Sequence, residues 1–205
     1  IAKEGWELAR VMMDGTDLTL GRVETGFLAM AKDRRYSPYD GTVEIVGKDG
    51  RSLGTFTGAD YARHIEEFSE DWSYLKFTRL KKGDFYRVGP LARLNICSAM
   101  GTPLADAALK EYRGRFGELV QAPLAYNLAR YVEFLASCER AVELLEDPAI
   151  AGESIRVPVS GVKARRGVGI VEAPRGTLIH DYTVNDQGFI EKCNLIVAPA
   201  RTTMP

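Results

Sequence analysis

A Pro-Arg-Gly bend is the stretch of this sequence that is best suited to chemistry. Arg175 stands between Pro174 and Gly176, with Glu172 before the bend and His180 after it. Proline fixes its own φ angle and glycine permits a close backbone approach, so the neighbours set the backbone of this arginine. An arginine held in this way can present its guanidinium to a site. The alternative is a surface turn with a solvated arginine, and spacing alone leaves both readings open.

Predicted strands lie on both sides of this bend. Residues 168–171 are rich in valine and isoleucine, which favour strands. The even spacing of apolar side chains within residues 178–184 places them on one face of a second strand. Residues 185–188, Asn-Asp-Gln-Gly, have the composition of a turn. The apolar residues within 189–197 predict a third, buried strand.

Two further arginines flank the start of a predicted helix. Gly89 and Pro90 introduce a helix over about residues 91–100. Arg87 precedes this pair and Arg93 lies in the first turn of the helix. Both are candidates for holding a buried network of carboxylates or carbonyls. The alternative is that they form surface ion pairs.

Several other kinds of site are poorly supported. The chain has two histidines, His64 and His180, and no Gly-x-Ser-x-Gly or P-loop motif. Residues 167–169, Gly-Val-Gly, lack the third glycine of a dinucleotide fingerprint. The short basic cluster of Lys163, Arg165 and Arg166 is too small for a nucleic-acid-binding arm.

The three cysteines stand alone, at positions 97, 138 and 193. Their number and wide spacing imply neither a disulfide framework nor a zinc site. A reducing cytoplasm fits this usage. Cys97 is expected to be a small core residue.

The periodicity of the chain predicts an α+β fold. The predicted helices cover residues 3–13, 60–69, 91–100, 103 to about 117, and 123–146. The last of these is the long central helix of a helical core, because its apolar residues step alternately by four and three from Leu124 to Leu145. Trp6, Ala9, Met12 and Met13 form the expected buried stripe of the first helix. A β-hairpin is predicted at 42–56, with a two-residue turn at Asp49-Gly50.

Composition and charge exclude several classes of partner. The chain has 205 residues, 45% of them hydrophobic, and a net charge of −1. This balance favours neither nucleic acid nor a membrane surface. No apolar run approaches the roughly 20 residues that span a bilayer, and the start lacks the pattern of a signal peptide. The chain begins with Ile1 and ends just past a predicted strand, so we expect a piece of a longer protein.

The sequence resembles the large subunit of nickel–iron hydrogenases. Residues 168–180, VGIVEAPRGTLIH, are similar to the EAPRGxLxH stretch of that protein. Residues 84–95, DFYRVGPLARLN, are similar to a segment of the cytoplasmic, cofactor-coupled members of the family. WSYLK at 72–76 and GTPLA at 101–105 agree with the family as well, and these blocks occur in family order. The resemblance extends over most of the chain.

The resemblance implies reversible oxidation of H2 at a nickel–iron centre held by two Cys-x-x-Cys pairs, one near each end of the subunit. This sequence has neither pair, so it corresponds to the middle of the subunit, and by itself it is expected to hold no metal and to be inactive. The resemblance places Arg175 over the metals beside Pro174. It gives His180 a role in orienting residues near the metals, and Glu172 a role in anchoring the bend. The residues that carry the second block are Arg87, Gly89, Pro90, Arg93 and Asn95.

The implied partners are H2 and an iron–sulfur small subunit. Electrons would pass through that subunit to a partner linked to nicotinamide, deazaflavin or a disulfide. Within the family fold we divide the chain into a part with the hairpin (1–83), a helical core (84–147) and a β-rich part with the bend (148–205). Apolar surface that meets the rest of the large subunit is expected to favour self-association.

Two other functions stay open. One is a metal-free, hydrogenase-like scaffold that serves as an interaction module. The other is a relative of the quinone-site subunit of respiratory complex I, which His180 and the block at 84–95 disfavour. The chain also departs from the family at Asn127 and Asp181, where many relatives carry histidine.

Overall fold

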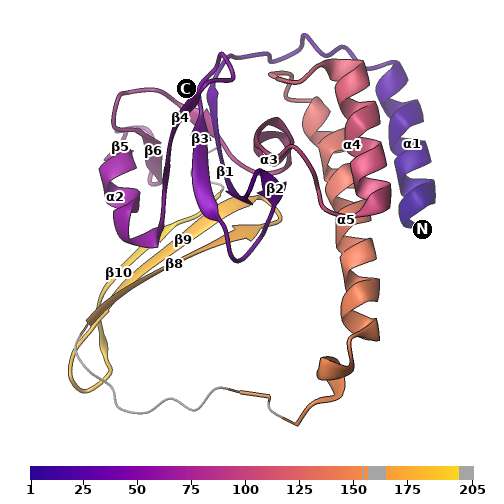
Figure 1. Cartoon of the computed structure of the whole chain (residues 1–205). Helices are drawn as coiled ribbons and strands as arrows, with labels where there is room; N and C mark the ends of the chain where they lie inside the picture. Colours follow the sequence, from indigo (N-terminus) through magenta and orange to yellow (C-terminus); the bar gives the residue numbers. More distant parts are fainter. Residues whose placement is uncertain (154, 157–164, 199–205) are drawn as a thin grey trace.

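The three longest helices gather on one side of the molecule and the β-sheets on the other (Figure 1). This computed structural model describes residues 1–153, 155–156 and 165–198. The helical layer contains α1 (Ala2–Asp14), α4 (Pro103–Phe116) and α5 (Ala125–Glu146), with α1 and α4 both packed on α5. The short α3 (Pro90–Ile96) lies between α5 and the sheets and contacts both α5 and β1 (Gly26–Lys32).

The sheet next to α3 is built around β1. This strand pairs antiparallel with β2 (Arg35–Tyr36) and β3 (Thr42–Val46), and parallel with β7 (Tyr86–Arg87). β4 (Ser52–Phe56) pairs with β3 at the edge. β1 is buried along six of its seven residues, because it has neighbours on both edges and packed layers on both faces.

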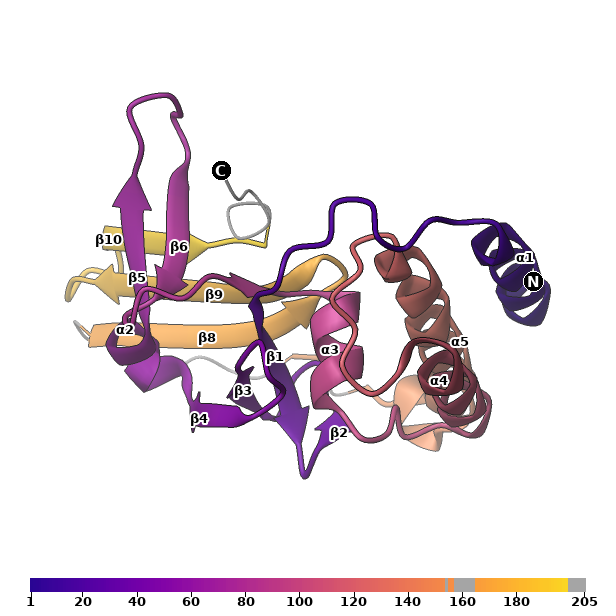
Figure 2. The same cartoon turned by 90° about the horizontal axis from the view of Figure 1, so that it is seen from above.

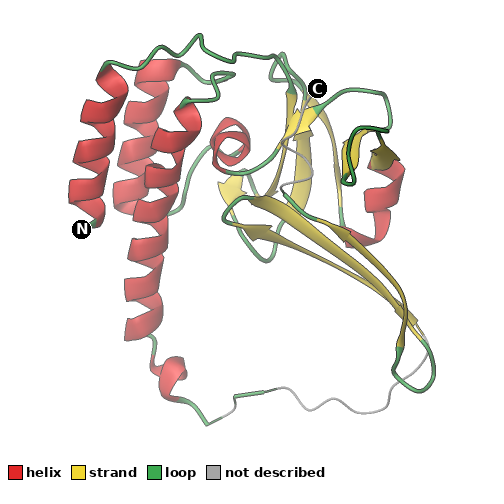
Figure 3. Cartoon of the chain, turned by 180° about the vertical axis from the view of Figure 1, so that it is seen from behind, coloured by secondary structure: helices red, strands yellow, loops and turns green. Residues whose placement is uncertain are grey.

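A second, three-stranded sheet carries the bend. β8 (Arg165–Ala173), β9 (Gly176–Val184) and β10 (Ile190–Ile196) form an antiparallel sheet in the order β10-β9-β8. Seen from above, this sheet runs beneath the hairpin of β5 (Ile65–Ser69) and β6 (Lys76–Leu80) (Figure 2). Its bend end reaches toward α3, and its other end points away from the helices (Figure 3).

Two hydrophobic cores hold these layers together. One is formed mainly by the helices and β1, and the other by the sheets together with Ile179 and Ile196 of the bend sheet. The α+β class, the long central helix, the hairpin and the C-terminal antiparallel sheet are confirmed. The division at residues 84 and 148 stays a prediction, since each core draws side chains from more than one of the three parts.

Some expected elements are wrong in type or length. Residues 65–69 form strand β5 rather than the end of a helix, and the helix there, α2, covers only Tyr61–His64. Pairing with β6 at every residue of β5 overrides the local helical pattern. α3 ends at Ile96, so Cys97 follows the helix, although it is buried as expected. The loop of the β3–β4 hairpin is longer than the two residues expected.

Several apolar residues expected in the core are exposed. Met12 on α1 is 65% exposed. On α5, Val142 is 54% exposed and Leu145 is 69% exposed. The C-terminal half of α5 extends beyond α1 and α4, so its side of the apolar seam has no helix to pack on (Figure 3). β10 is largely exposed as well, with only Ile196 buried.

Candidate functional site

The bend at Ala173–Gly176 is a two-residue turn that joins β8 to β9. Ala173 pairs with Gly176, which leaves Pro174 and Arg175 at the tip. Gly176 has a φ of +142°, and a Cβ there would lie 2.4 Å from a methyl carbon of Val88. Only glycine therefore fits at this position without moving Val88.

The loop before α3 meets the bend from the other side. Gly89 has a φ of +86°, and a Cβ there would lie 2.7 Å from the carbonyl oxygen of Arg175. Tyr126 on α5 donates its hydroxyl to the carbonyl of Val88 at 2.8 Å. Pro90 begins α3 immediately afterwards. The two family-like blocks of the sequence are thus in direct backbone contact.

Arg93 is the central residue of this contact. Its side chain is 1% exposed, and all five of its N–H donors are used. Nε and Nη2 donate to the two carboxylate oxygens of Glu133 at 2.5 and 2.8 Å. Nη1 donates to Glu172 at 2.5 Å and to the carbonyl of Ala173 at 3.1 Å, while Nη2 reaches the carbonyl of Pro174 at 3.1 Å. Arg93 therefore binds the bend through two carbonyls and one carboxylate.

Glu172 anchors the same bend to the neighbouring sheet. One carboxylate oxygen accepts hydrogen bonds from the backbone N–H of Met30 at 2.9 Å and the hydroxyl of Thr177 at 2.6 Å. Its own backbone N–H donates to the carbonyl of Pro38 at 2.9 Å. The side chain is fully buried. The bend is thereby fixed to β1 as well as to α3.

The network carries one positive group and two negative groups that are largely shielded from water. Burial alone would lower the pKa of Arg93, but the ion pairs with Glu133 and Glu172 outweigh it and raise that pKa. Burial also raises the pKa of Glu133, although Arg93 opposes this. The nearby Tyr36 has its pKa raised to about 12, mainly by burial. The Arg93 guanidinium therefore stays charged, and its charge compensates the buried carboxylates of Glu133 and Glu172.

The two residues at the tip of the bend are exposed. Within the part of the chain that the structure describes, no hydrogen bond or ion pair forms on the Arg175 side chain, so its guanidinium is free to meet something outside this chain. The backbone below it is fixed, whereas its side chain is not.

His180 lies apart from this tip. It is four residues beyond Gly176 on β9, roughly 13 Å along the strand. Its ring lies on the sheet face opposite Thr177 and Ile179, and its Nδ1 is 3.0 Å from the hydroxyl of Tyr182. The structure therefore brings Glu172 and Pro174 together with Arg175, but not His180.

Arg87 and Asn95 hold other segments near the bend. Arg87 donates to the carbonyls of Gln121, at 2.7 Å, and Val23, and its burial lowers its pKa. Asn95 exchanges two hydrogen bonds of 2.9 Å with the backbone of Val120. These contacts fix the segment that leads from α4 into α5, and neither residue touches Arg175.

The residue that the sequence reading missed is Glu133. It lies on α5 among Ala129, Val132 and Ala136, which are all buried. A carboxylate within an apolar i, i+3, i+4, i+7 stripe was the available signal, because such a group must have a buried partner. The arginine in the apolar helix α3 was the natural candidate for that partner.

Replacing Gly176 with alanine should lower the free energy of unfolding by about 2–4 kcal/mol. The added methyl group would meet Val88, and the backbone would hold an unfavourable φ. Urea unfolding of the full chain measures this loss. Gly114 on α4 is the matched control, since a Cβ there meets nothing within 4 Å. Its change to alanine should be neutral or stabilising by up to about 1 kcal/mol. Equal effects of the two changes would refute the packing of the bend on Val88.

Asp181 connects the bend sheet to α2. It accepts two hydrogen bonds from Arg166, at 2.8 and 2.6 Å, and one of 2.8 Å from the hydroxyl of Tyr61. Asn194 on β10 adds a bond to that hydroxyl and another to Glu67. Of the basic cluster expected here, Arg166 makes this pair, while Lys163 lies outside the described residues.

Changing Asp181 to asparagine should cost about 1–2 kcal/mol at pH 7. The hydrogen bonds from Arg166 hold the pKa of Asp181 below its usual value, even though burial opposes them. The carboxylate therefore stabilises the fold above its unfolded pKa of about 4, and this contribution disappears as the pH falls through the lower folded pKa. Unfolding from pH 7 to pH 3 should show the two proteins converging. Glu7→Gln, in the exposed pair with Arg10, should change stability by less than about 0.5 kcal/mol.

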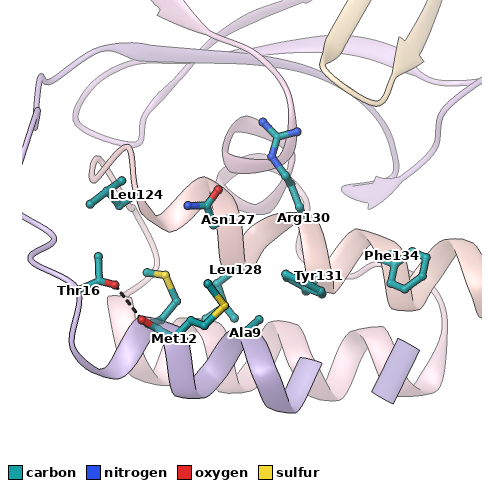
Figure 4. A pocket seen from close by; sticks show the side chains of 10 residues that line it. Ala9, Met12, Thr16, Leu124, Asn127, Leu128, Arg130, Tyr131 and Phe134 are labelled. Carbon is teal, nitrogen blue, oxygen red and sulfur yellow. Dashed lines mark hydrogen bonds between the residues drawn. The ribbon is translucent and has the colours of Figure 1, made fainter. Parts of the chain in front are cut away.

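An apolar groove lies between α1 and α5, away from the bend. It encloses about 650 Å³ and is lined by Met12, Met13, Leu128, Tyr131 and Phe134, among others. In Figure 4, Leu128 and Tyr131 lie on the side of α5 that faces α1, while Arg130 points away from α1. The groove offers apolar contact but no converging polar groups, so it lacks the features of a catalytic site.

The described residues do not form a metal-binding group. No three of their His, Cys, Asp or Glu side chains come together as ligands for a metal ion. Cys97 is buried, Cys138 is partly buried and Cys193 is exposed, and none is in a disulfide. Among the described helices, none combines the length and apolar character needed to cross a membrane.

Comparison with known proteins links this chain to nickel-dependent hydrogenases. Residues 13–203 match the family model described as nickel-dependent hydrogenase. The chain is 43% identical over 184 residues to a vhu subunit of the F420-non-reducing hydrogenase of Methanococcus voltae, a match covering 88% of this chain and 44% of the relative. It is 38% identical over 169 residues to the NAD-reducing hydrogenase HoxS subunit beta of Cupriavidus necator. This match covers 78% of this chain and 34% of the relative. The chain thus spans less than half the length of these relatives.

Solved structures agree with this assignment. An NAD+-reducing [NiFe]-hydrogenase in the H2-reduced state superposes with a TM-score of 0.89 at 34% identity, over 98% of this chain and 46% of that one. A [NiFeSe]-hydrogenase of Dm. baculatum gives a TM-score of 0.68 at 20% identity, which shows a common fold only. The expected family fold is confirmed.

Proposed function

The chain belongs to the nickel-dependent hydrogenase family, and from this premise we propose that it forms the middle part of a hydrogenase large subunit. The whole protein would catalyse the reversible oxidation of H2 to two protons and two electrons. The chain accounts for 44% of the length of its Methanococcus voltae relative, so the activity belongs to the complete protein.

One observation carries this proposal. The bend presents Arg175 as an exposed cation on a backbone that Arg93 and Glu172 hold from within the protein. A surface turn that only reverses the chain needs no such buried network. A site that must hold a cation in a fixed place does need it, since misplacing a reacting group by about 1 Å can cost a hundredfold in rate.

The role we propose for Arg175 is electrostatic. Splitting H2 into a proton and a hydride equivalent separates charge, and a guanidinium beside the reacting molecule stabilises the negative part. A guanidinium keeps its own proton across ordinary pH values. Arg175 would therefore polarise the H–H bond as a permanent charge, and the proton released would pass to a base elsewhere in the complete protein. Pro174 restricts the turn, and Glu172 holds it in place.

We propose that the metal ligands lie in the rest of the complete protein. Soft thiolate ligands suit nickel and iron, but the three cysteines of this chain are scattered and differ in burial. We therefore assign this chain the positioning of a cation and not the binding of the nickel–iron centre. That centre would be held by cysteines elsewhere in the complete protein.

The proposed partner is an iron–sulfur small subunit that receives the electrons. Among the similar proteins, one from Archaeoglobus profundus is named an iron-sulfur subunit of an F420-non-reducing hydrogenase, and another is named an NAD-reducing hydrogenase subunit. We propose a cytoplasmic location and a cofactor-linked acceptor beyond the small subunit. Cys97, Cys138 and Cys193, which are unpaired, are compatible with a reducing compartment.

The test is to express the complete gene with its neighbouring genes and to purify the resulting complex. We expect the complex to contain nickel, to reduce a viologen dye with H2, and to exchange D2 with protons of the solvent. A nickel-loaded complex with neither activity would refute the proposal.

Two other outcomes would replace it. A complete protein without nickel that still binds its neighbours would indicate the scaffold function. Quinone-dependent electron transfer without hydrogen exchange would indicate the relative of complex I.

A further inference from the structure

We propose that Arg93 and Glu133 are positioning residues for Arg175. Glu133 fixes the plane of the Arg93 guanidinium, and this guanidinium holds the bend. The bend in turn determines where the Arg175 guanidinium lies. Glu133 belongs to the helical layer and Arg175 to a β-hairpin, so the proposal gives α5 a part in placing that cation. It rests on the proposed function, because it assumes that Arg175 acts on H2.

Every hydrogen-bond donor of the Arg93 guanidinium is occupied. Each of its five N–H groups has a partner, and two of the acceptors are carbonyls of the bend itself, those of Ala173 and Pro174. A planar guanidinium can satisfy two carboxylates and two carbonyls at once only in one orientation. A rotation or shift of that plane would therefore lose a bond to the bend.

Glu133 sets the plane of the Arg93 guanidinium. It binds Arg93 through both carboxylate oxygens, with Nε and Nη2 as donors. Nη2 is the same nitrogen that reaches the carbonyl of Pro174, the residue next to Arg175. The Arg93 guanidinium thus links the Glu133 carboxylate directly to the backbone next to Arg175. It also links the bend to α5, as the closeness of α3 to α5 in Figure 2 illustrates.

The placement of Arg175 depends on its backbone. Its side chain is exposed and makes no hydrogen bond or ion pair with the described residues. The point from which this side chain extends is therefore set by its backbone, which meets Gly89 at its carbonyl and is held through Ala173 and Pro174. A change at Glu133 would reach Arg175 through this route.

A double-mutant cycle in the complete enzyme tests this coupling. Glu133→Gln keeps the volume of the side chain but loses one of the two bonds to Arg93. We expect it to lower kcat for H2 oxidation about tenfold to a hundredfold, with little change in KM. In an enzyme that already carries Arg175→Met, the same change should cost less than about twofold, because there is no guanidinium left to misplace.

A matched control is available on the same helix. Glu139 also accepts two hydrogen bonds, from the backbone N–H groups of Leu104 and Ala105 at 2.9 and 3.0 Å. It holds the start of α4 and does not contact the bend. Glu139→Gln should leave kcat within about twofold, and any effect it has should be the same with and without Arg175.

A second readout does not depend on activity. Hydrogen–deuterium exchange by mass spectrometry should show faster exchange in the peptide that covers residues 173–177 when Glu133 is changed to glutamine. The same measurement on Glu139→Gln should show faster exchange at the start of α4 instead. Nickel content should match the wild type in both variants.

The outcomes separate the two proposals. Additive effects of Glu133→Gln and Arg175→Met, or unchanged exchange at 173–177, would overturn the positioning role alone. Wild-type activity of Arg175→Met would overturn the proposed role of Arg175 and the present inference with it. If Glu133→Gln fails to assemble, Glu133→Asp, which keeps the charge but shortens the reach, takes its place in the same cycle with the same two criteria.

Discussion

Replacing Arg175 with methionine should lower kcat for H2 oxidation by about 10²–10³-fold, the usual effect of removing one preorganised group that stabilises developing charge. Because the Arg175 side chain is exposed and makes no hydrogen bond or ion pair with the described residues, the free energy of unfolding should change by less than about 0.5 kcal/mol. Arg175→Lys should fall between the two proteins, since it keeps the charge but not the planar fork. Initial rates with a viologen acceptor measure all three.

The control for this prediction is Arg165→Met. Arg165 is an exposed arginine of the same sheet, and it pairs with Val184 at the end away from the bend. Its loss should leave turnover unchanged. If Arg175→Met and Arg165→Met both have wild-type turnover and wild-type nickel content, then the bend is a surface turn with a solvated arginine.

The parts of this fold that follow from local periodicity were predictable. Residues 125–146 show the helical repeat without interruption, and the bend carries its own turn residues. Strand β5 was not predicted, because its extended conformation depends on pairing with β6, which follows it in the chain after a long turn. The exposure of β10 was missed for a related reason, since an apolar strand gives no sign of whether a layer covers it.

The candidate site was predictable at its tip but not at its base. Proline and glycine around Arg175 mark the turn in the sequence itself. The pairing of Arg93 with Glu133, 40 positions apart, and with Glu172, 79 positions apart, is set by the packing of α3 against α5 and the bend. Spacing along the chain cannot reveal it, because a charged residue in an apolar helix shows that it needs a buried partner but not which residue that partner is.

The second large effect expected is on stability. Changing Arg93 to methionine should lower the free energy of unfolding of the full chain by about 3–5 kcal/mol at pH 7, because it leaves Glu133 and Glu172 buried without a counter-charge. The carbonyls of Ala173 and Pro174 would also lose a donor. Urea unfolding, read by tyrosine and tryptophan fluorescence, gives the difference.

This loss should depend on pH in a defined direction. Burial already raises the pKa of Glu133 in the wild-type protein, and without the opposing charge of Arg93 this carboxyl group should bind a proton on folding. A folded-state pKa above the unfolded one stabilises the protein below the unfolded value, and the stabilisation is lost as the pH rises through the folded one. The variant should therefore be closest to the wild type near pH 4 and furthest from it near pH 8.

Arg113→Met is the control that isolates this charge effect. Arg113 is also largely buried, but it donates mainly to carbonyls, those of Leu94, Cys97 and Ser98, and its one ion pair is with the exposed Glu118. Its loss should lower stability without a comparable dependence on pH. A pH-independent loss for Arg93→Met would mean that the carboxylates find water, and that the network is not closed as the structure has it.

Arg93→Met also tests why the network of Arg93, Glu133 and Glu172 is built from charged residues. A buried ion pair contributes little net stability compared with apolar residues of the same volume, because the cost of desolvation offsets the attraction. Arg93→Met combined with Glu133→Leu should therefore recover part of the stability that Arg93→Met loses, since only Glu172 remains as a buried carboxyl. It should not recover turnover, because the bend still lacks a donor for the carbonyls of Ala173 and Pro174. Recovery of stability without recovery of turnover would separate the fold from the placement of Arg175, whereas recovery of both would show that any well-packed core can hold the bend.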